Sequence, residues 1–328
     1  SILQMPFLTS NSYNETPFML LNGHLETIIP SLFHKAPIVN YERQRLELKD
    51  GDFIDLDWLL KNNYDRLLII THGLEGNSER HYVRRTAKYF HDLGWDVLAW
   101  NCRSCSGEIN RLSKFYHHGD TNDLNEVILE ALSDKYSKAV LFGYSMGGSL
   151  SIKYLGEGRT LDPRIKGAVT YSVPLNLKDS GDQLNKRANR FYTQRFLKKL
   201  IKKVRIKAKY YPGILDIEGI DQIKTFDDFH YKYTLPLYDF PSLDVFYEKA
   251  TCDQFLSSLS VPVFVGNALN DPLLGTKCYP KEEAKQNKLF YLQTPLKGGH
   301  VGFSYQNKDY SWMETRGAYF MKEVLLIS

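Results

Sequence analysis

The chain has 328 residues, of which 43 % are hydrophobic and 24 % are charged, and this composition excludes disordered, collagen-like and coiled-coil chains. Its net charge of +4 is too small for this length to indicate a nucleic-acid partner. Four cysteines exclude a disulfide-rich secreted scaffold and are typical of a reducing compartment.

The first forty residues are expected to form an arm that lies on the main body, because they contain four prolines and one short helical pattern, at 24–33. No segment approaches the roughly 18 consecutive apolar residues of a membrane span. Residues 1–6 lack the basic and apolar regions of a signal peptide, so the expected location is cytoplasmic. The chain does not begin with methionine, so this expectation applies only to the residues given.

Residues 42–48 and 53–59 alternate polar and apolar side chains, and the turn residues Lys49-Asp50-Gly51-Asp52 between them predict an N-terminal antiparallel hairpin. Short apolar runs then alternate with helical patterns, which predicts an α/β fold with a mostly parallel, doubly wound sheet. The expected strands are 67–70, 97–100, 139–142, 168–171, 263–265 and 289–292. The expected helices are 79–93, 120–136, 147–156 and 310–326.

Residues 176–260 interrupt this alternation and are expected to form an inserted helical cap. The predicted domains are therefore an arm (1–40), a core (41–175 and 261–328) and the cap. The cap opens with apolar residues at helical spacing: Leu184, Ala188, Phe191, Leu197, Leu200, Ile201, Val204 and Ala208. Between 178 and 209 there are twelve Lys and Arg and two acids, which fits either a solvated helix face or a basic surface that meets anionic lipid or an acidic acyl substrate.

Ser145 lies in Gly143-Tyr144-Ser145-Met146-Gly147, directly after an expected strand and before an expected helix. This is the context of the G-x-S-x-G nucleophile elbow, in which a sharp turn exposes the serine at a helix N-terminus. A tight turn with an ordinary serine is the alternative. The flanking strand and helix favour a catalytic nucleophile.

The partners of such a serine follow in the order acid and histidine. Asp271 follows the expected strand 263–265, and His300 lies in a glycine-rich loop after the last expected strand. Both positions place a side chain at the carboxyl end of the sheet, so Ser145, Asp271 and His300 are predicted to form a catalytic triad. Three other carboxylates remain alternatives to Asp271, namely Asp239, Asp244 and Asp253.

The segment Thr71-His72-Gly73-Leu74 follows the expected strand 67–70 and is similar to the His-Gly motif that forms part of an oxyanion hole. The backbone amides of Leu74 and Met146 are therefore predicted to bind the oxyanion. The His72 side chain is expected to fix the loop by hydrogen bonds.

Two further motifs are given a structural interpretation. Cys102 and Cys105 spell C-x-x-C, but no second cysteine pair is present for zinc, so packing is favoured over redox chemistry. His118 and Asp123 have the spacing of some acyltransferases, but a loop and a helix N-cap explain this weak pattern and are favoured over a second catalytic centre. Neither a metal nor a cofactor is expected.

Over essentially its whole length the sequence resembles the α/β-hydrolase superfamily, and within it the YheT-like predicted hydrolases. That branch includes fungal medium-chain ethyl ester synthase/esterases and animal α/β-hydrolase-domain phospholipases. The resemblance rests on 22–27, 72–78, 101–103, 118–124, the Ser145 elbow, 270–272 and 299–302. Ser104 and Cys105 depart from it, because members commonly carry glycine after the arginine, and a different local backbone is expected.

The resemblance implies a serine esterase of short- to medium-chain acyl esters that works through an acyl-enzyme. An acyltransferase that passes the acyl group to an alcohol is the second hypothesis, and a non-catalytic hydrolase-fold binding protein is the third. The expected partner is a small-molecule acyl ester, with peripheral contact between the basic cap and anionic lipid as a further hypothesis. The oligomeric state is left open.

Overall fold

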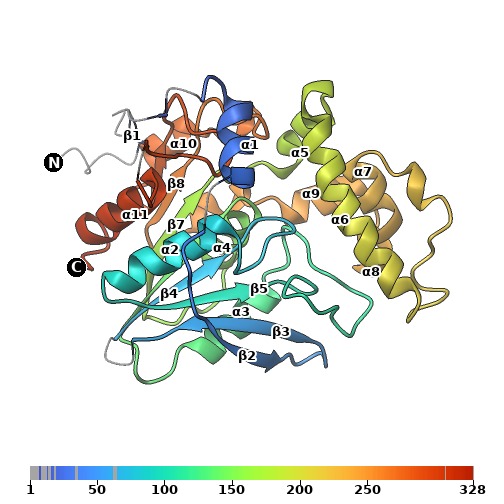
Figure 1. Cartoon of the computed structure of the whole chain (residues 1–328), viewed down its shortest axis with the longest axis horizontal. Coiled ribbons are helices and arrows are strands. Elements are labelled where there is room, and N and C mark those ends of the chain that lie inside the picture. Colours follow the sequence, from blue (N-terminus) through green and yellow to red (C-terminus); the bar gives the residue numbers. More distant parts are fainter. Residues whose placement is uncertain are drawn as a thin grey trace.

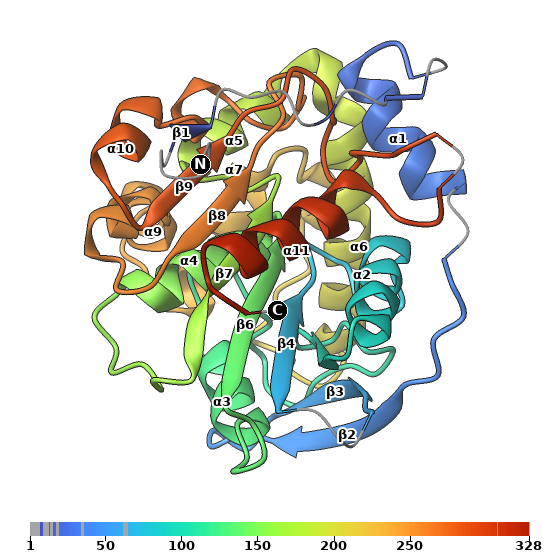
Figure 2. The same ribbon diagram turned by 90° about the vertical axis from the view of Figure 1, so that its left-hand side faces the viewer.

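The computed structural model describes residues 7–8, 13, 16–17, 20–33, 36–61, 65–306 and 308–327. Within this part of the chain, nine strands form one twisted sheet with helices on both of its faces (Figure 1 and Figure 2). The strands are β1 Phe7–Leu8, β2 Glu42–Glu47, β3 Phe53–Leu59, β4 Arg66–Thr71, β5 Asp96–Asn101, β6 Lys138–Tyr144, β7 Ile165–Tyr171, β8 Val263–Gly266 and β9 Phe290–Gln293. Their order in the sheet is β1-β9-β8-β7-β6-β4-β5-β3-β2.

The sheet is the mostly parallel one that the sequence predicts. Strands β4 to β9 run parallel, while β2 and β3 form the predicted antiparallel hairpin, and β3 pairs antiparallel with β5. The central strands are apolar on both faces because each face is covered: α2 (His81–Asp92) and α11 (Trp312–Glu323) contribute to the core on one side, and α3 (Asn122–Ala131) and α4 (Met146–Gly156) to the core on the other. Among the described residues no helix has the length and apolar character of a membrane span.

The third expected helix is shorter than predicted. The pattern predicted a helix from 120 to 136, but α3 ends at Ala131 and the chain turns. The reason is Asp96, a fully buried carboxylate that accepts hydrogen bonds from the Tyr136 hydroxyl (2.9 Å) and the Lys135 ammonium. These hydrogen bonds hold Lys135 and Tyr136 in the turn after α3 and not in a continued helix.

The arm contains the expected helix, α1 (Gly23–Phe33), and a strand that the sequence did not predict. This strand is β1, which extends the sheet by pairing parallel with β9. Two residues are too few to show the alternation of a strand, so hydrophobic periodicity could not predict β1. Residues 1–6, which the signal-peptide argument used, lie outside the described residues.

Between β7 and β8 the chain leaves the sheet and forms a group of helices at one side of the molecule (Figure 1). Its α-helices are α5 Leu177–Asn185, α6 Arg190–Ala208, α7 Phe226–Phe229, α8 Leu235–Leu237 and α9 Leu243–Ala250. Four other helical segments, of 3-10 or π type, are η2 Arg187–Asn189, η3 Ile220–Gln222, η4 His230–Thr234 and η5 Asp253–Ser258. η6 Thr276–Cys278 and α10 Lys281–Gln286 follow β8. The domain boundaries 1–40, 41–175, 176–260 and 261–328 stay a prediction, and residues 176–260 are called the insertion below.

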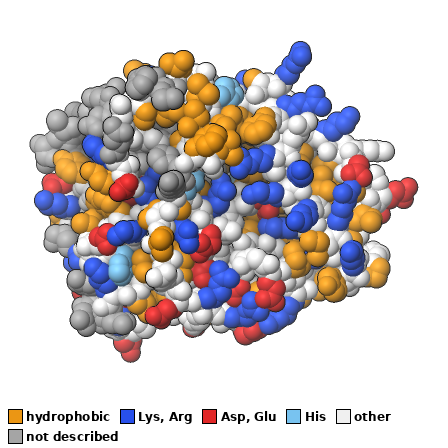
Figure 3. Space-filling view, viewed as in Figure 1, with side chains coloured by type: hydrophobic (Ala, Val, Ile, Leu, Met, Phe, Trp, Pro, Cys, Tyr) orange, Lys and Arg blue, Asp and Glu red, His pale blue; other side chains and the backbone are white. Residues whose placement is uncertain are grey.

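The continuous helical pattern at the start of the insertion is divided into α5 and α6. The break is at Lys186, and Asn189 stabilises it by donating to the carbonyl oxygens of Gln183 (2.8 Å) and Pro272 (2.7 Å). Most of the apolar stripe is buried in a separate small core that includes Leu197, Leu200 and Val204. Phe191 and Ala188 do not join it, since the Phe191 side chain is 52 % exposed and Ala188 is also exposed. Figure 3 shows Lys and Arg side chains gathered over α6.

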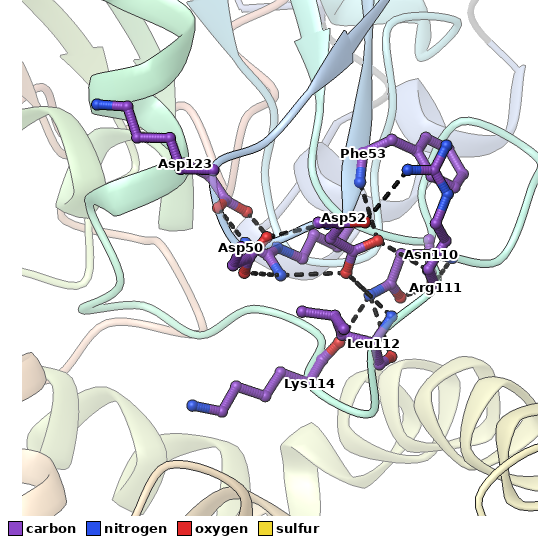
Figure 4. A network of polar contacts seen from close by, with 12 residues as sticks. Asp50, Asp52, Phe53, Asn110, Arg111, Leu112, Lys114 and Asp123 are labelled. Carbon is purple, nitrogen blue, oxygen red and sulfur yellow. Dashed lines mark hydrogen bonds and ion pairs between the residues drawn. The ribbon is translucent and has the colours of Figure 1, made fainter.

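A buried carboxylate, Asp52, holds the loop on which the insertion rests (Figure 4). Asp52 accepts hydrogen bonds from the Asn110 side chain (2.5 Å) and from the backbone amides of Phe53 (2.9 Å) and Arg111 (2.7 Å). Lys207, at the end of α6, donates to two carbonyl oxygens of the same loop, those of Leu112 and Lys114. The turn of the hairpin is therefore connected to the insertion through residues 110–114.

Candidate active site

Ser145 lies in the sharp turn between β6 and α4. Its backbone has φ 51° and ψ −117°, a conformation that costs a non-glycine residue of order 1–3 kcal/mol and is characteristic of functional turns. The turn is held by the Ser145 amide, which donates to the Tyr171 carbonyl oxygen at 2.9 Å. Gly147 allows α4 to lie against β4, since a Cβ there would come within 2.1 Å of the Thr71 carbonyl oxygen.

The structure brings Ser145, His300 and Asp271 together from three different strand ends. His300 Nε2 lies 2.9 Å from Ser145 Oγ, and His300 Nδ1 lies 2.8 Å from Asp271 Oδ2. The Asp271 side chain is buried, and its other oxygen accepts the Leu273 amide at 2.9 Å. The carboxylate therefore accepts a hydrogen bond from the Nδ1–H of His300, which leaves Nε2 free to accept a hydrogen bond from the Ser145 hydroxyl.

The three alternative carboxylates have other surroundings. Asp253 accepts hydrogen bonds from Asn176 and from Thr251. Asp244 lies in the first turn of α9, and Asp239 lies in a turn after α8, with φ 56°. In the described part of the chain none of the three is a hydrogen-bond partner of His300.

The loop that holds Leu74 lies directly beside Ser145. A Cβ on Gly73 would come within 3.3 Å of the Ser145 Cβ, so the loop backbone passes close to the hydroxyl. Met146 is the first residue of α4, and the amide at this position has no acceptor within the helix. The binding of an oxyanion by the amides of Leu74 and Met146 stays a prediction.

His72 fixes this loop, as expected. Its Nε2 accepts a hydrogen bond from the Cys102 amide (3.0 Å), so its Nδ1 carries the proton and donates to the Gly73 carbonyl oxygen (2.7 Å). Burial lowers the pKa of His72 to about 4, which keeps the imidazole neutral. A neutral His72 joins the loop to the end of β5 without adding charge beside Ser145.

Sequence reasoning missed the contribution of α1 to the site. The Glu26 carboxylate accepts the Gly298 amide, and the Thr27 hydroxyl accepts the His300 amide at 2.9 Å. A Cβ on Gly23 would come within 1.8 Å of the Asn270 carbonyl oxygen, so α1 lies against the loop before Asp271 as well. The family resemblance already included residues 22–27. Only the structure shows that these residues contact the loops that hold Asp271 and His300.

A buried ion pair connects the insertion to the Leu74 loop. Lys203 of α6 lies 2.8 Å from the Glu75 carboxylate, and Tyr116 donates to the same group at 2.5 Å. The Glu75 backbone has φ 55°, which fixes the turn directly after Leu74. Lys203 also lies 3.3 Å from the sulfur of Cys105, so the two segments are joined at several atoms.

In the two motifs that were given a structural interpretation, Cys102, Cys105 and Asp123 are buried, and His118 lines a cavity that also reaches Ser145. Cys102 and Cys105 are free thiols, and burial raises the pKa of Cys105 to about 11. Asp123 accepts two hydrogen bonds from Arg103, at 2.7 and 2.8 Å. Ser104, which replaces the common glycine, has φ 63°, and its hydroxyl contacts the Asn110 side chain at 2.5 Å.

Two cavities meet at Ser145 and His300. The larger has a volume of about 110 Å³ and lies between α1, the Leu74 loop and α6. The smaller has a volume of about 50 Å³ and extends beneath the insertion. Its lining is mainly apolar and aromatic, and includes Leu177, Leu184, Phe196, Phe226 and Tyr247. A group bonded to the Ser145 oxygen can therefore extend in two directions.

Comparisons with known proteins identify the family of this fold. Residues 66–208 match the family described as the alpha/beta hydrolase fold. Escherichia coli YheT, which is named as an esterase, is 32 % identical over 86 % of this chain and 84 % of its own length. The phospholipase ABHD3 of Bos taurus is 26 % identical over 85 % and 70 %, and a monoacylglycerol lipase of Saccharomyces cerevisiae is 27 % identical over 97 % and 82 %.

Among solved structures, the Pyrococcus furiosus esterase Pf2001 superposes with a TM-score of 0.56 at 18 % identity, covering 88 % of this chain and 98 % of its own. The fungal α/β hydrolase GrgF gives a TM-score of 0.56 at 14 % identity, covering 88 % and 100 %. At these identities the likeness concerns the fold alone.

Proposed function

The chain belongs to the α/β-hydrolase family, in the branch of the esterase YheT, and is a hydrolase that acts on ester bonds; we propose that Ser145, His300 and Asp271 are its catalytic triad. The observation that carries the proposal is the continuous hydrogen-bonded series from Asp271 Oδ2 through the imidazole to Ser145 Oγ, at 2.8 and 2.9 Å. Each of the three comes from a strand end at the same edge of the sheet.

In the proposed mechanism, His300 Nε2 removes the hydroxyl proton as Ser145 Oγ attacks the ester carbonyl carbon. Asp271 holds the Nδ1 proton and stabilises the imidazolium. The carbonyl oxygen becomes an oxyanion, which the amides of Leu74 and Met146 bind, each contributing about 2.7–4 kcal/mol to the lowering of the barrier.

The tetrahedral intermediate then collapses, and His300 gives the proton to the departing alcohol. Water, deprotonated by the same imidazole, attacks the acyl-serine and releases the carboxylic acid and the serine hydroxyl. We assign the acyl chain to the 50 Å³ cavity, because its apolar lining suits a short hydrocarbon chain. This size favours short acyl chains over long ones.

The basic surface of the insertion supports a second proposal, peripheral contact with anionic lipid. A groove on one face of α6 is lined by Arg187, Arg190, Lys198, Lys202, Arg205 and Lys209. The apolar side chains of Leu32, Phe33 and Phe191 are 52 %, 73 % and 52 % exposed on α1 and at the start of α6. Exposed apolar groups beside a band of cations are typical of surfaces that lie on lipid headgroups.

A fluorophosphonate probe tests the nucleophile. The wild-type protein should be labelled at Ser145 and should hydrolyse p-nitrophenyl butyrate, because the activated oxygen attacks phosphorus as it attacks a carbonyl. Ser145→Ala should lose both the labelling and the turnover while its thermal unfolding stays cooperative. Labelling that persists in Ser145→Ala would mean that another residue is the nucleophile. Adding ethanol or glycerol to the assay distinguishes hydrolysis from acyl transfer, because a transferase forms the new ester in place of the acid.

A further inference from the structure

Three cations line the larger cavity beside Ser145. Arg80 lies at the N-terminus of α2, and Arg195 and Lys199 lie one turn apart on α6, where they line this cavity and not the basic groove. Two helices far apart in the sequence thus bring positive charge to the same cavity. The Arg195 side chain is half-buried there and has lost part of its hydration.

In the part of the chain that the structure describes, no carboxylate forms an ion pair with these cations. Among the described residues neither arginine forms an ion pair, and Lys199 donates to a backbone carbonyl oxygen, that of Glu75, at 3.2 Å. The Glu75 carboxylate is already paired with Lys203. Burial lowers the pKa of Arg195, and the charge of Arg80 lowers it further; the same two causes act on Lys199. An unneutralised positive potential therefore extends into the cavity, where an anion would be stabilised.

The smaller cavity has the opposite character. Its two histidines, His118 and His230, are neutral near pH 7, because burial lowers their pKa values to about 4 and about 3. The remaining lining is mainly apolar. A charged group would lose its hydration there without gaining a partner, which excludes an anionic acyl chain from this side.

We propose that the 110 Å³ cavity is an anion subsite, in which Arg80, Arg195 and Lys199 bind a phosphate group carried by the alcohol portion of the ester. This inference rests on the proposed function of Ser145. The substrate class is an ester of a phosphorylated alcohol with a short acyl chain. Hydrolysis then releases a carboxylic acid and the phosphorylated alcohol, with the phosphate itself unchanged.

Two soluble substrates that differ only in the phosphate test this inference: 1-butyrylglycerol 3-phosphate and 1-butyrylglycerol. The quantity to measure is the ratio of kcat/KM for the first to kcat/KM for the second. The wild type should prefer the phosphate ester, and Arg195→Gln/Lys199→Gln should lower the ratio roughly tenfold or more, because hydrogen bonds to charged groups are lost. Arg80→Gln, on a different helix, should lower the ratio in the same direction.

The matched control is Lys166→Gln/Lys322→Gln, which removes two positive charges from β7 and α11, outside the lining of the cavity. Its ratio should equal that of the wild type. If the control lowers the ratio as much as the α6 variant, or if the wild type has no preference for the phosphate ester, the subsite does not exist as proposed. Thermal unfolding of each variant shows that it is folded.

Two further measurements distinguish a phosphate group of the substrate from free phosphate and from the phosphate of a membrane surface. Inorganic phosphate should inhibit the wild type only weakly, whereas glycerol 3-phosphate should inhibit it competitively and less well in Arg195→Gln/Lys199→Gln. Equal inhibition by both would mean that the cations bind free phosphate, which contradicts a substrate subsite. If the variant changes turnover only on phosphatidic acid vesicles, the cations serve membrane contact, which also contradicts it. Hydrolysis that persists in Ser145→Ala would instead refute the proposed function, whatever the ratio.

Discussion

The backbone amide of His300 donates a hydrogen bond to the hydroxyl of Thr27 at 2.9 Å, although the two residues are separated by 273 positions in the sequence. The same hydroxyl donates to the carbonyl oxygen of Gly23 at 2.6 Å. Helix α1 therefore fixes the position of the proposed general base from outside the sheet. A displacement of His300 of about 1 Å is enough to misalign Nε2 with the Ser145 hydroxyl.

Thr27→Val keeps the shape of the side chain and removes the hydroxyl. We expect kcat for p-nitrophenyl butyrate to fall roughly five- to tenfold with little change in KM, because one hydrogen bond contributes about 1 kcal/mol. Thr27→Ser restores the hydroxyl and should recover most of the rate. If Ser at this position is as slow as Val, packing of the methyl group and not the hydrogen bond positions His300.

Asp271→Asn tests the proposed acid. The amide keeps the size of the side chain but favours the wrong imidazole tautomer, so kcat should fall by up to about ten-thousand-fold. Asp253→Asn and Asp244→Asn are the matched controls, and both should retain near-normal turnover, because neither carboxylate contacts His300. A large loss in a control, with normal activity in Asp271→Asn, would identify a different acid.

The sheet and the positions of the site residues were accessible from sequence because both depend on local patterns. Apolar runs covered on both faces predict the parallel strands, and the elbow around Ser145 is set by the glycines that flank it. Chain order then placed Asp271 and His300 at neighbouring strand ends. The roles of these three residues, and of the amides of Leu74 and Met146, remain proposals that the variants above test.

What the sequence did not provide depends on contacts between distant segments. Glu26 and Thr27 carry no catalytic pattern, and their importance comes from the loop that folds against them. Asn189 ends a helical pattern early because its amide bonds to Pro272, on another segment. Arg195 and Arg80 line the same cavity because α6 lies against the loop that contains Leu74 and Glu75, and periodicity does not report that contact.

Lys207 should make stability depend on pH. Burial lowers its pKa from the ordinary value of 10.5 to about 7. Between these two values the unfolded chain binds the proton and the folded protein does not, so the contribution of Lys207 to the free energy of unfolding rises with pH across this window. Below about pH 7 both states are protonated, and the unfavourable contribution is constant.

The measurement is urea unfolding of wild type and Lys207→Met at pH 7, 8 and 9. The free energy of unfolding of the wild type, minus that of the variant, should increase from pH 7 to pH 9. Other titratable groups are present in both proteins, so their contributions to the free energy of unfolding cancel in this difference. A difference that is flat over this range, or that falls, would show that Lys207 keeps its charge in the folded protein.

Lipid contact through α6 is tested by charge reversal in the basic groove. Lys198 and Lys202 are the lysines to reverse, because both line the groove. Lys199 and Lys203 are left unchanged, since Lys199 lines the Ser145 cavity and Lys203 pairs with Glu75. Wild-type protein should sediment with phosphatidylcholine vesicles that contain phosphatidylglycerol and not with phosphatidylcholine alone. Each lysine near the surface contributes about 1 kcal/mol, and screening removes this as salt rises.

Lys198→Glu/Lys202→Glu should therefore lower binding to the anionic vesicles roughly thirtyfold or more, since two contributions of about 1 kcal/mol are lost and repulsion is added. Lys166→Glu/Lys322→Glu changes the net charge equally, away from the groove, and should bind nearly as the wild type does. Equal losses in both variants would mean that net charge alone attracts the protein. Equal wild-type binding to both kinds of vesicle would leave the cations of α6 as a solvated helix face, with no part in recognising a lipid surface.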